Sequence, residues 1–503
     1  MPNGFQRAAL EGILAKILYL LTRLAIPPMV LSQVGLQEYG LWSIAFVLVG
    51  YLGLSVSGIA TVYVREIAQA FERDDPHHAS GMLSTGVALA LLIGGGFCLG
   101  LVLFMPWFLR VFAISPPLQS LATLLLLTTT LVFLADLTLG AWGYVLHGLN
   151  RVHEQQRIWV ASFILEWLIM VSLLYFNWGI TALLGGFVLR YVFSIACAWW
   201  RVHQIWPALQ LKPSFVRKTY LQPFLHLGIK SQISDACAII LHSADRILTS
   251  VSFGSASAAI VDLGSKLPAT AISISSGISA IVLPRAACMN PQQLAEFYPK
   301  VLRLSMLSLL WVMPVMVACA PALHIAWLGF RPESAMILQT LLWLTPAWQL
   351  HTLTGCASSA LRGQAELRLE FIYHLMRIFS CAITYFCSSS LLQFITYFAI
   401  GNGLAALAYL FIASQRLSMS PTLVFRQTLL PLLLGYCLAY SFTWLWPWQL
   451  TSRSLALVEL LQTSSLFTLC LSVVIWKFAL TSAEKSWLIY QWTKLLKHEV
   501  HHA

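Results

Sequence analysis

The chain has 503 residues, of which 58% are hydrophobic and only 10% are charged. This composition lies far outside the range of soluble globular domains and excludes a soluble enzyme. The formal net charge of +11 would indicate a nucleic-acid partner in a soluble protein, but here the basic residues gather in alternate loops, so no nucleic-acid partner is expected. We therefore expect an all-α polytopic membrane protein.

Apolar runs of membrane-spanning length follow one another along the chain. A span needs about 20 apolar residues, which predicts about 14 transmembrane helices. They lie near residues 12–31, 40–62, 83–106, 119–147, 158–178, 181–200, 225–249, 256–283, 301–322, 336–358, 370–388, 391–413, 428–446 and 455–478. The N-terminus lacks a short apolar core followed by a small-residue cleavage site, so the first span is expected to be retained as an anchor.

The basic residues of the connections predict the orientation. If the N-terminus is cytoplasmic, the inner connections and the tail hold Arg65, Arg73, Arg151, Arg157, Arg201, Lys212, Arg217, Lys218, Arg285, Lys300, Arg362, Arg368, Arg416, Arg426, Lys485, Lys494 and Lys497. The outer connections hold only Arg110, Arg331 and Arg453. By the positive-inside rule, both termini are predicted to be cytoplasmic.

Several charges lie inside predicted spans of the first lobe. Lys16 and Arg23 share a face of the first helix, and Arg23 lies about two turns deeper than Lys16. Asp136, Glu166 and Arg190 lie in the fourth, fifth and sixth spans. Three charges on successive helices can satisfy one another, so we expect these three to be mainly structural.

Two pairs of similar segments suggest an internal duplication. SISSGISAIVLPR, which ends at Arg285, resembles GLSVSGIATVYVR, which ends at Arg65; CASSALRGQAELR, ending at Arg368, resembles WGYVLHGLNRVHEQQR, ending at Arg157. The marker glycines are 113 residues apart in the first half (Gly35 to Gly148) and 109 in the second (Gly254 to Gly363). Chance similarity among Gly- and Ser-rich membrane helices is the alternative.

The proline-rich, basic segment 201–222 is the longest inner linker and the expected boundary between lobes. We predict a six-helix lobe at 1–210, a second six-helix lobe at 211–416 and two additional helices at 417–480. Residues 481–503 have capping-box spacing and one apolar face, which predicts an amphipathic helix on the inner membrane surface.

Charges interrupt the two apolar runs between Leu225 and Arg285. A charge at bilayer depth costs roughly 2.5–3.5 kcal/mol, so these side chains are expected to face protein or water. Asp262 and Lys266 fall on one stripe of the second run, whereas Asp235, His242 and Arg246 share a face of the first run. The interior charges are basic in balance, which favours an anionic ligand in a low-dielectric cavity.

No nucleophile–base pair, metal-ligand cluster or nucleotide loop stands out, so neither an enzyme nor a cofactor or metal site is expected. The cysteines lie mostly in apolar runs without a C-x-x-C pair, and we interpret them as small packing residues.

Short motifs along nearly the whole chain carry a family resemblance. They are VGLQEYGLWSIA, HSADRILTSVSFG, VLPR, AWLG and ALRGQAELR. With about 14 spans in two lobes plus two helices, the chain resembles the polysaccharide-transporter (Wzx-type) branch of the multidrug/oligosaccharidyl-lipid/polysaccharide flippase superfamily. One departure is Asp262, where that family commonly has a tyrosine.

The resemblance implies a bacterial inner-membrane flippase. Its substrate would be an undecaprenyl-pyrophosphate-linked oligosaccharide, its other partners the bilayer and a polysaccharide polymerase with export machinery. Arg23 and Lys266, with Lys16 and Lys230 as weaker candidates, are expected to bind the pyrophosphate, and Asp262 and Asp235 are candidates for ion coupling. The alternatives are that Lys266 merely pairs with Asp262, that the protein is a multidrug cation antiporter, or that it is a non-transporting subunit of a polysaccharide synthase.

Overall fold

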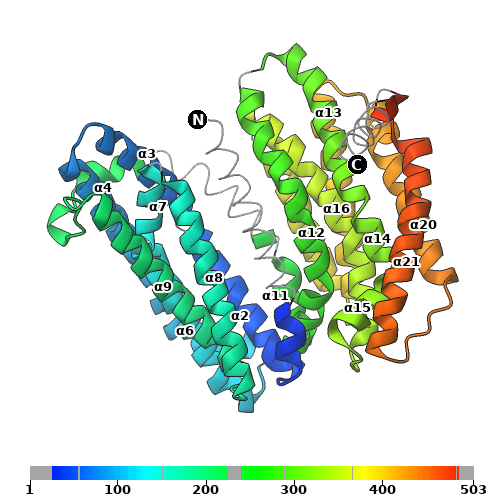
Figure 1. Cartoon of the computed structure of the whole chain (residues 1–503), viewed down its shortest axis with the longest axis horizontal. Helices are drawn as coiled ribbons and strands as arrows, with labels where there is room; N and C mark the ends of the chain where they lie inside the picture. The colour runs from blue at the N-terminus through cyan, green and yellow to red at the C-terminus, as the bar shows by residue number, and fades with distance from the viewer. Residues whose placement is uncertain are drawn as a thin grey trace, which may run out of the picture. The chain divides into compact units, whose positions relative to one another are not determined.

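The structure is a computed structural model (Figure 1), and it describes residues 25–54, 57–112, 114–149, 151–224, 240–241, 243–287, 289–364, 366, 368–482 and 484–486. These residues form helices and loops without a strand. The α-helices are α2 (Leu36–Leu54), α3 (Ser57–Glu72), α4 (Pro76–Leu103), α5 (Met105–Val111), α6 (Gln119–Thr138), α7 (Ala141–Gly148), α8 (Val152–Tyr175), α9 (Thr181–Ile205), α11 (Ala244–Phe253), α12 (Ser255–Ala287), α13 (Pro291–Leu310), α14 (Met313–Ala318), α15 (Ala320–Leu328), α16 (Ser334–Gly363), α17 (Arg368–Cys387), α18 (Leu391–Arg416), α19 (Pro421–Val424), α20 (Leu430–Leu445) and α21 (Arg453–Val474).

Single turns of other helical types complete the secondary structure. Short 3₁₀ turns lie at Pro116–Leu118, Pro213–Phe215 and Lys218–Tyr220. Two π-helical turns, Phe425–Leu429 and Ile475–Ala479, adjoin α20 and α21.

The predicted all-α membrane fold is confirmed. Each expected span within the described residues coincides with one helix or with consecutive helices. Eight helical segments of this part of the chain are long and apolar enough to cross a membrane. The exact number of about 14 spans therefore stays a prediction.

The chain divides into two compact units. Unit 1 comprises Met1–Leu263 and Tyr385–Phe394, and unit 2 comprises Gly264–Thr384 and Ile395–Ala503. Compactness and sequence repetition are different properties, so the predicted lobes at 1–210 and 211–416 stay predictions.

In unit 1, α8 and α9 run side by side and α6 packs against both α2 and α4 (Figure 1). The core between α3, α4, α7 and α9 contains Tyr63, Met82, Val145 and Val202, all almost fully buried. The segment after α9 lies on α4, where three hydroxyls accept backbone N–H groups. These bonds join Gln210 N to Ser80 Oγ (3.0 Å), Lys212 N to Ser84 Oγ (3.2 Å) and Arg217 N to Thr85 Oγ1 (3.3 Å).

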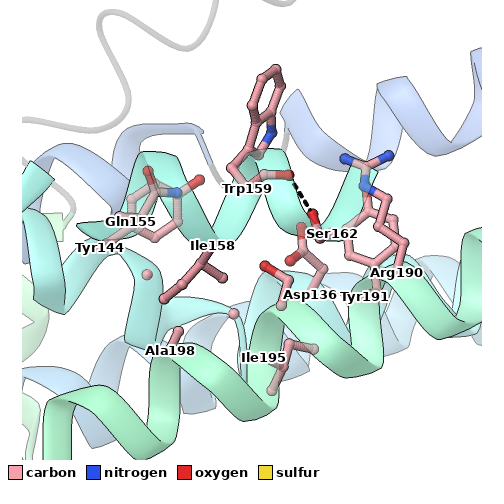
Figure 2. A pocket seen from close by; sticks show the side chains of 13 residues that line it. Asp136, Tyr144, Gln155, Ile158, Trp159, Ser162, Arg190, Tyr191, Ile195 and Ala198 are labelled. Atoms are coloured by element: carbon pink, nitrogen blue, oxygen red, sulfur yellow. Dashed lines mark hydrogen bonds between the residues drawn. The ribbon is translucent and has the colours of Figure 1, made fainter. Parts of the chain in front are cut away.

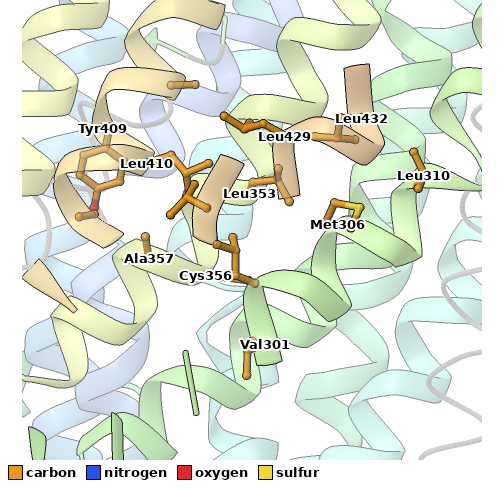
Figure 3. Packing of buried hydrophobic residues seen from close by; sticks show 14 of the residues in the cluster. Val301, Met306, Leu310, Leu353, Cys356, Ala357, Tyr409, Leu410, Leu429 and Leu432 are labelled. Carbon is orange, nitrogen blue, oxygen red and sulfur yellow. The ribbon is translucent and has the colours of Figure 1, made fainter. Parts of the chain in front are cut away.

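In unit 2, apolar side chains of α13, α16, α18 and α20 interdigitate (Figure 3). Met306, Leu353, Leu410 and Leu432 lie in this core and are at most 4% exposed. Beside it, α14 packs on α20 and α15 on α21. The core therefore includes the additional helices predicted at 417–480.

The outer surface of both units is apolar. Exposed side chains include Leu92 at 74%, Phe379 at 68% and Leu461 at 68%. An apolar surface of this kind is unfavourable in water but matches the hydrocarbon of a bilayer. The helices also satisfy their own backbone hydrogen bonds, as the hydrocarbon requires.

Basic residues of alternate connections lie together within each unit. In unit 1, Arg151 and Arg201 both bind Glu154. In unit 2, Arg362 binds Glu370 through two hydrogen bonds of 2.7 and 2.8 Å, and the neighbouring Arg416 binds Glu366 at 2.8 Å.

Two further basic residues of unit 2, Arg331 and Arg453, lie at another pair of connections. Arg453 donates to the carbonyls of Ala326 and Trp327, just before the loop that carries Arg331. This grouping agrees with the predicted alternation of loops, while the cytoplasmic side of each end stays a prediction.

Candidate substrate-binding site

A polar cavity of about 280 Å³ opens between α6, α7, α8 and α9 of unit 1, and we refer to it as the α6–α9 cavity (Figure 2). Its lining comprises Asp136, Gly140, Gly143, Tyr144, Gln155, Ile158, Trp159, Ser162, Arg190, Tyr191, Ser194, Ile195 and Ala198. Figure 2 shows Tyr144 and Gln155 toward one end and Asp136, Ser162 and Arg190 toward the other. The cavity lies entirely within unit 1.

An ion pair holds one end of the cavity. Arg190 Nη1 of α9 lies 3.4 Å from Glu166 Oε2 of α8, and the side chains are 11% and 7% exposed. The guanidinium also lies over the rings of Phe163, at 3.7 Å, and Tyr191, at 4.7 Å. Buried charge needs such pairing, and the rings add a cation–π contribution.

The two helices approach closely because α9 carries a glycine at the contact. A Cβ at Gly186 would lie 2.8 Å from the carbonyl oxygen of Glu166 and 3.3 Å from Cβ of Met170. The absence of a side chain lets α8 and α9 pack at small separation, as small residues do in membrane helices.

Asp136 lies in the same cavity but outside the ion pair. Among the described residues, no hydrogen bond or ion pair reaches its carboxylate. The structure thus brings together two of the three charges predicted to be structural and places the third beside them. Their structural role stays a prediction, and the position of Asp136 gives it access to a ligand.

The cavity faces away from the apolar surface of its helices. On α8, Gln155, Ser162 and Trp159 line the cavity, whereas the exposed Ile164 and Leu168 lie on the other side. Ser162 and Ile164 differ by about 200° around the helix at about 100° per residue. The polar groups are therefore kept away from lipid, where they would be costly.

Unit 2 contains a smaller polar site between α16, α17 and α18. Arg377 is 2% exposed, and its Nε donates to Asn402 Oδ1 at 2.9 Å. Close to it, His351 Nδ1 and Tyr373 Oη are 2.6 Å apart. The adjoining cavity is about 10 Å³, which holds about one water molecule.

The two sites occupy corresponding positions of the predicted duplication. Asp136 lies 12 residues before Gly148, and His351 lies 12 before Gly363. In the same way, Glu166 and Arg377 each lie nine residues beyond the arginine that ends the marker segment. The separation to the partner on the next helix is 24 residues in unit 1 and 25 in unit 2.

A third polar group joins α2, α11 and the start of α12. Asp262 accepts a hydrogen bond from Tyr39 Oη at 3.0 Å and pairs with Arg246 Nη1 at 3.1 Å. Gly40 allows this approach, because a Cβ there would lie 2.0 Å from the carbonyl oxygen of Ser255. The tyrosine and glycine of the YGLW motif thus have a defined role in packing.

Lys266 follows Asp262 by one turn of α12 and is half-buried. Arg246 and Tyr39 hold the Asp262 carboxylate, so the structure gives this group a guanidinium partner that the sequence interpretation did not name. The other predicted site residues, Lys16, Arg23, Lys230 and Asp235, lie outside the described residues, as does His242. The roles expected of these residues stay predictions.

Sequence reasoning missed the polar side chains that complete both sites. Tyr144, Gln155 and Ser194 line the α6–α9 cavity, and His351 and Asn402 complete the site in unit 2. The register of the duplication was the available signal, since it aligns Asp136 with His351.

Two further features bear on ligands. Among the described residues, no group of three or more His, Cys, Asp or Glu side chains is arranged to hold a metal ion. An apolar groove of about 250 Å³ lies between α16, α18 and α20, lined by Trp343, Pro346, Ala347, Leu350, Ala399, Ile400, Gly403, Leu404, Leu407 and Tyr440.

Solved structures identify the fold. The chain is similar to the lipid II flippase MurJ in its inward closed conformation, with a TM-score of 0.70, 11% identity and coverage of 93% of this chain and 98% of MurJ. An inward-facing multidrug resistance MATE transporter of the MOP superfamily gives a TM-score of 0.59 at 15% identity, covering 79% of this chain and 94% of the transporter. A MOP transporter from Pyrococcus furiosus gives 0.58 at 16% identity, covering 82% and 95%. The chain is therefore a multi-pass membrane protein with the fold of MOP-superfamily transporters.

The family follows from the sequence comparison. Residues 34–329, more than half of the chain, match the model of the family described as "Polysaccharide biosynthesis protein", and the chain belongs to this family. A comparison with curated proteins finds no match. The predicted resemblance to the polysaccharide-transporter branch is confirmed.

Proposed function

We propose that this protein is a bacterial inner-membrane flippase that moves an undecaprenyl-pyrophosphate-linked oligosaccharide from the cytoplasmic to the periplasmic leaflet by alternating access. The observation that carries the proposal is the combination of a polysaccharide biosynthesis family with a transporter fold. A sugar polymer assembled outside the membrane needs its lipid-linked units moved across the bilayer. Both termini are proposed to be cytoplasmic, and a polymerase with export machinery is the proposed downstream partner.

The pyrophosphate is proposed to bind Arg23 and Lys266, with Lys16 and Lys230 as weaker contributors. Lys266 lies half-buried in α12, one turn from an Asp262 carboxylate already paired with Arg246. A half-buried ammonium attracts a diphosphate strongly because the surrounding dielectric constant is low. Asp262 and Asp235 are the proposed ion-coupling groups.

The apolar groove supports a polyprenyl-linked substrate. Its lining is almost wholly hydrocarbon, and the Tyr440 hydroxyl donates to the carbonyl of Leu342 at 2.6 Å, which leaves that hydroxyl satisfied. An isoprenoid chain can pack there without desolvating an unpaired polar group.

Flipping of a fluorescent undecaprenyl-pyrophosphate oligosaccharide in proteoliposomes tests the function. We expect Lys266→Ala and Arg23→Ala to abolish most transport at wild-type abundance. Lys266→Arg should be milder than Arg23→Lys, because a guanidinium holds two phosphate oxygens in a planar fork. Normal flipping by both alanine variants would contradict the proposed anion site, and no flipping by the wild-type protein would contradict the function.

A multidrug cation antiporter is the second candidate. Asp136 favours it, because its carboxylate faces the α6–α9 cavity and makes no hydrogen bond or close ion pair with another described residue. Efflux of ethidium from the same proteoliposomes, driven by a proton gradient, would support this candidate.

A further inference from the structure

The α6–α9 cavity contains hydrogen-bonding groups that the described residues do not satisfy. Across the part of the chain that the structure describes, no hydrogen bond joins the Tyr144 hydroxyl, the Ser194 hydroxyl or the Asp136 carboxylate to another protein group. Among the described residues, the Gln155 amide makes one hydrogen bond, between its carbonyl oxygen and His147 Nε2 at 3.1 Å. These donors and acceptors come from four helices and converge on one space, as polar groups do in small-molecule sites.

The same cavity has aromatic walls. Tyr144 is 41% exposed, and its ring stacks on Tyr63 with centroids 6.5 Å apart. Tyr191 is fixed by edge contact with Phe187 at 4.8 Å. Rigid tyrosines offer an apolar face and a polar tip, a combination that suits a molecule with C–H faces and a rim of hydroxyls.

The charges around the cavity disfavour an anionic ligand. The lining carries one carboxylate, Asp136, and one guanidinium, Arg190. Arg190 is paired with Glu166, which lies outside the lining, so this group of three side chains has an excess of negative charge when all are ionised. A pyrophosphate or a carboxylate-bearing sugar would be repelled there. A carboxylate is well suited to accept two hydrogen bonds from neighbouring hydroxyls.

The volume of the cavity limits the size of its ligand. A volume of about 280 Å³ is just below the range of about 300–1,000 Å³ that drug-sized ligands occupy. The cavity therefore holds a single sugar ring and not a whole repeat unit.

From these four properties we infer that the α6–α9 cavity is a subsite for one neutral sugar residue of the transported lipid. This inference rests on the proposed function. The sugar is bound by hydrogen bonds to Asp136, Tyr144 and Ser194, with its apolar face against the tyrosine rings. The pyrophosphate is bound elsewhere, at the cationic residues.

The test measures binding to the full-length protein in nanodiscs by calorimetry. The probes are farnesyl pyrophosphate without sugar, the same lipid carrying glucose, galactose, mannose or N-acetylglucosamine, and the same lipid carrying glucuronic acid. We expect at least one neutral sugar to increase affinity over the sugar-free lipid, and glucuronic acid not to do so. Tyr144→Phe and Ser194→Ala should each reduce that gain about three- to tenfold, the usual effect of losing one hydrogen bond. Affinity for the sugar-free lipid should not change.

Asp136→Asn should lower the gain from the neutral sugar and weaken the discrimination against glucuronic acid. Matched controls come from the lipid-facing side of α8, where Tyr175 and Ser172 are exposed. Tyr175→Phe and Ser172→Ala make the same chemical changes outside the cavity, and they should leave the affinities for all the lipids unchanged.

The outcomes separate the two proposals. If the wild-type protein binds sugar-free and sugar-bearing lipids equally, or if the cavity variants keep the full gain, the sugar subsite is wrong while the flippase remains supported. Binding of ethidium that Asp136→Asn abolishes would also overturn the subsite. If no pyrophosphate lipid binds, the proposed function fails and the subsite fails with it.

Discussion

Corresponding helices of the two units each carry a buried polar pair, but the pairs differ in chemistry. In unit 1 a carboxylate of α8 meets a guanidinium of α9, Glu166 with Arg190. In unit 2 the guanidinium lies on the earlier helix, and Arg377 meets the neutral Asn402 on the later one. The neighbouring cavities differ as well, about 280 Å³ against about 10 Å³.

Under the predicted duplication, this position would keep its polar contact and change its chemistry. Both pairs join the same two helices of the predicted duplication, so the polar contact is kept even though the charges are exchanged. A polar cavity of about 280 Å³ lies beside the charged pair of unit 1, whereas the cavity beside the pair of unit 2 is about 10 Å³. We interpret unit 1 as the side adapted for a polar ligand and the site of unit 2 as a packing contact.

The largest effect is expected from breaking the ion pair of unit 1. Glu166→Gln should leave Arg190 buried without its counter-charge and cost about 3–5 kcal/mol of folding free energy. The amount of monodisperse protein and its thermal midpoint would both fall, measured by size-exclusion chromatography with fluorescence detection. The double variant Glu166→Leu/Arg190→Met should recover much of the loss. Normal stability with lost transport would instead place these residues in the substrate path.

Removing the partner of the buried guanidinium in unit 2 should have a smaller effect on stability. Asn402→Leu removes one hydrogen bond to a buried guanidinium, which costs about 1–3 kcal/mol. Asn402→Asp adds a counter-charge and should be tolerated. A thermal-melt series of both variants beside Glu166→Gln gives the ranking, and an equal loss for Asn402→Leu and Glu166→Gln would remove the distinction between the units.

A third comparison concerns close helix contacts at two glycines, Gly186 in unit 1 and Gly401 in unit 2. Gly186→Ala would press a methyl group on the backbone of α8, which should cost about 1–3 kcal/mol through overpacking. At Gly401 the nearest atom, at 2.0 Å from a built Cβ, is Ser380 Oγ, the end of a side chain. Gly401→Ala should therefore be rescued by Ser380→Ala, whereas no single truncation rescues Gly186→Ala. Thermal midpoints of these variants provide the measurement.

The smallest effect concerns the end of unit 2. Arg303 binds the Glu484 carboxylate at 2.6 and 2.7 Å, and this bond lowers the pKa of Glu484 from 4.5 to about 2. A carboxyl whose pKa is lower in the folded than in the unfolded state stabilises the folded protein at pH values above its unfolded-state pKa. This contribution is lost as the pH falls from about 4.5 toward 2. The midpoint difference between wild type and Glu484→Gln should therefore shrink between pH 6 and pH 3. A difference that stays constant with pH would argue against the contact.

The sequence was sufficient for the class of fold. Long apolar runs and basic residues in alternate connections predicted an all-α membrane protein, and the bundled helices confirm it. Charges inside spans pointed to Glu166 and Arg190, which do pair. These inferences succeed because burying a charge in hydrocarbon is costly enough to constrain the sequence by itself.

The remaining parts of the site depend on tertiary contact. Tyr39 reaches Asp262 from a helix 223 residues earlier in the chain, and no local pattern relates positions so far apart. Arg246 is only 16 residues away but lies on a separate helix, so helical periodicity does not predict this contact either. No sequence pattern distinguishes Tyr144 and Ser194, and their shared position becomes apparent only when four helices pack around one cavity. A hydroxyl side chain costs little free energy in a membrane helix, so its presence in the sequence does not by itself indicate a binding site.

The attachment of residues 210–217 to α4 has an evolutionary consequence. The hydroxyls of Ser80, Ser84 and Thr85 accept backbone N–H groups of this segment, and no side chain of the segment takes part in these bonds. A contact with the backbone does not depend on which side chain follows it. The segment can therefore vary in sequence while its path is inherited unchanged, except that proline at residue 210, 212 or 217 would remove a donor.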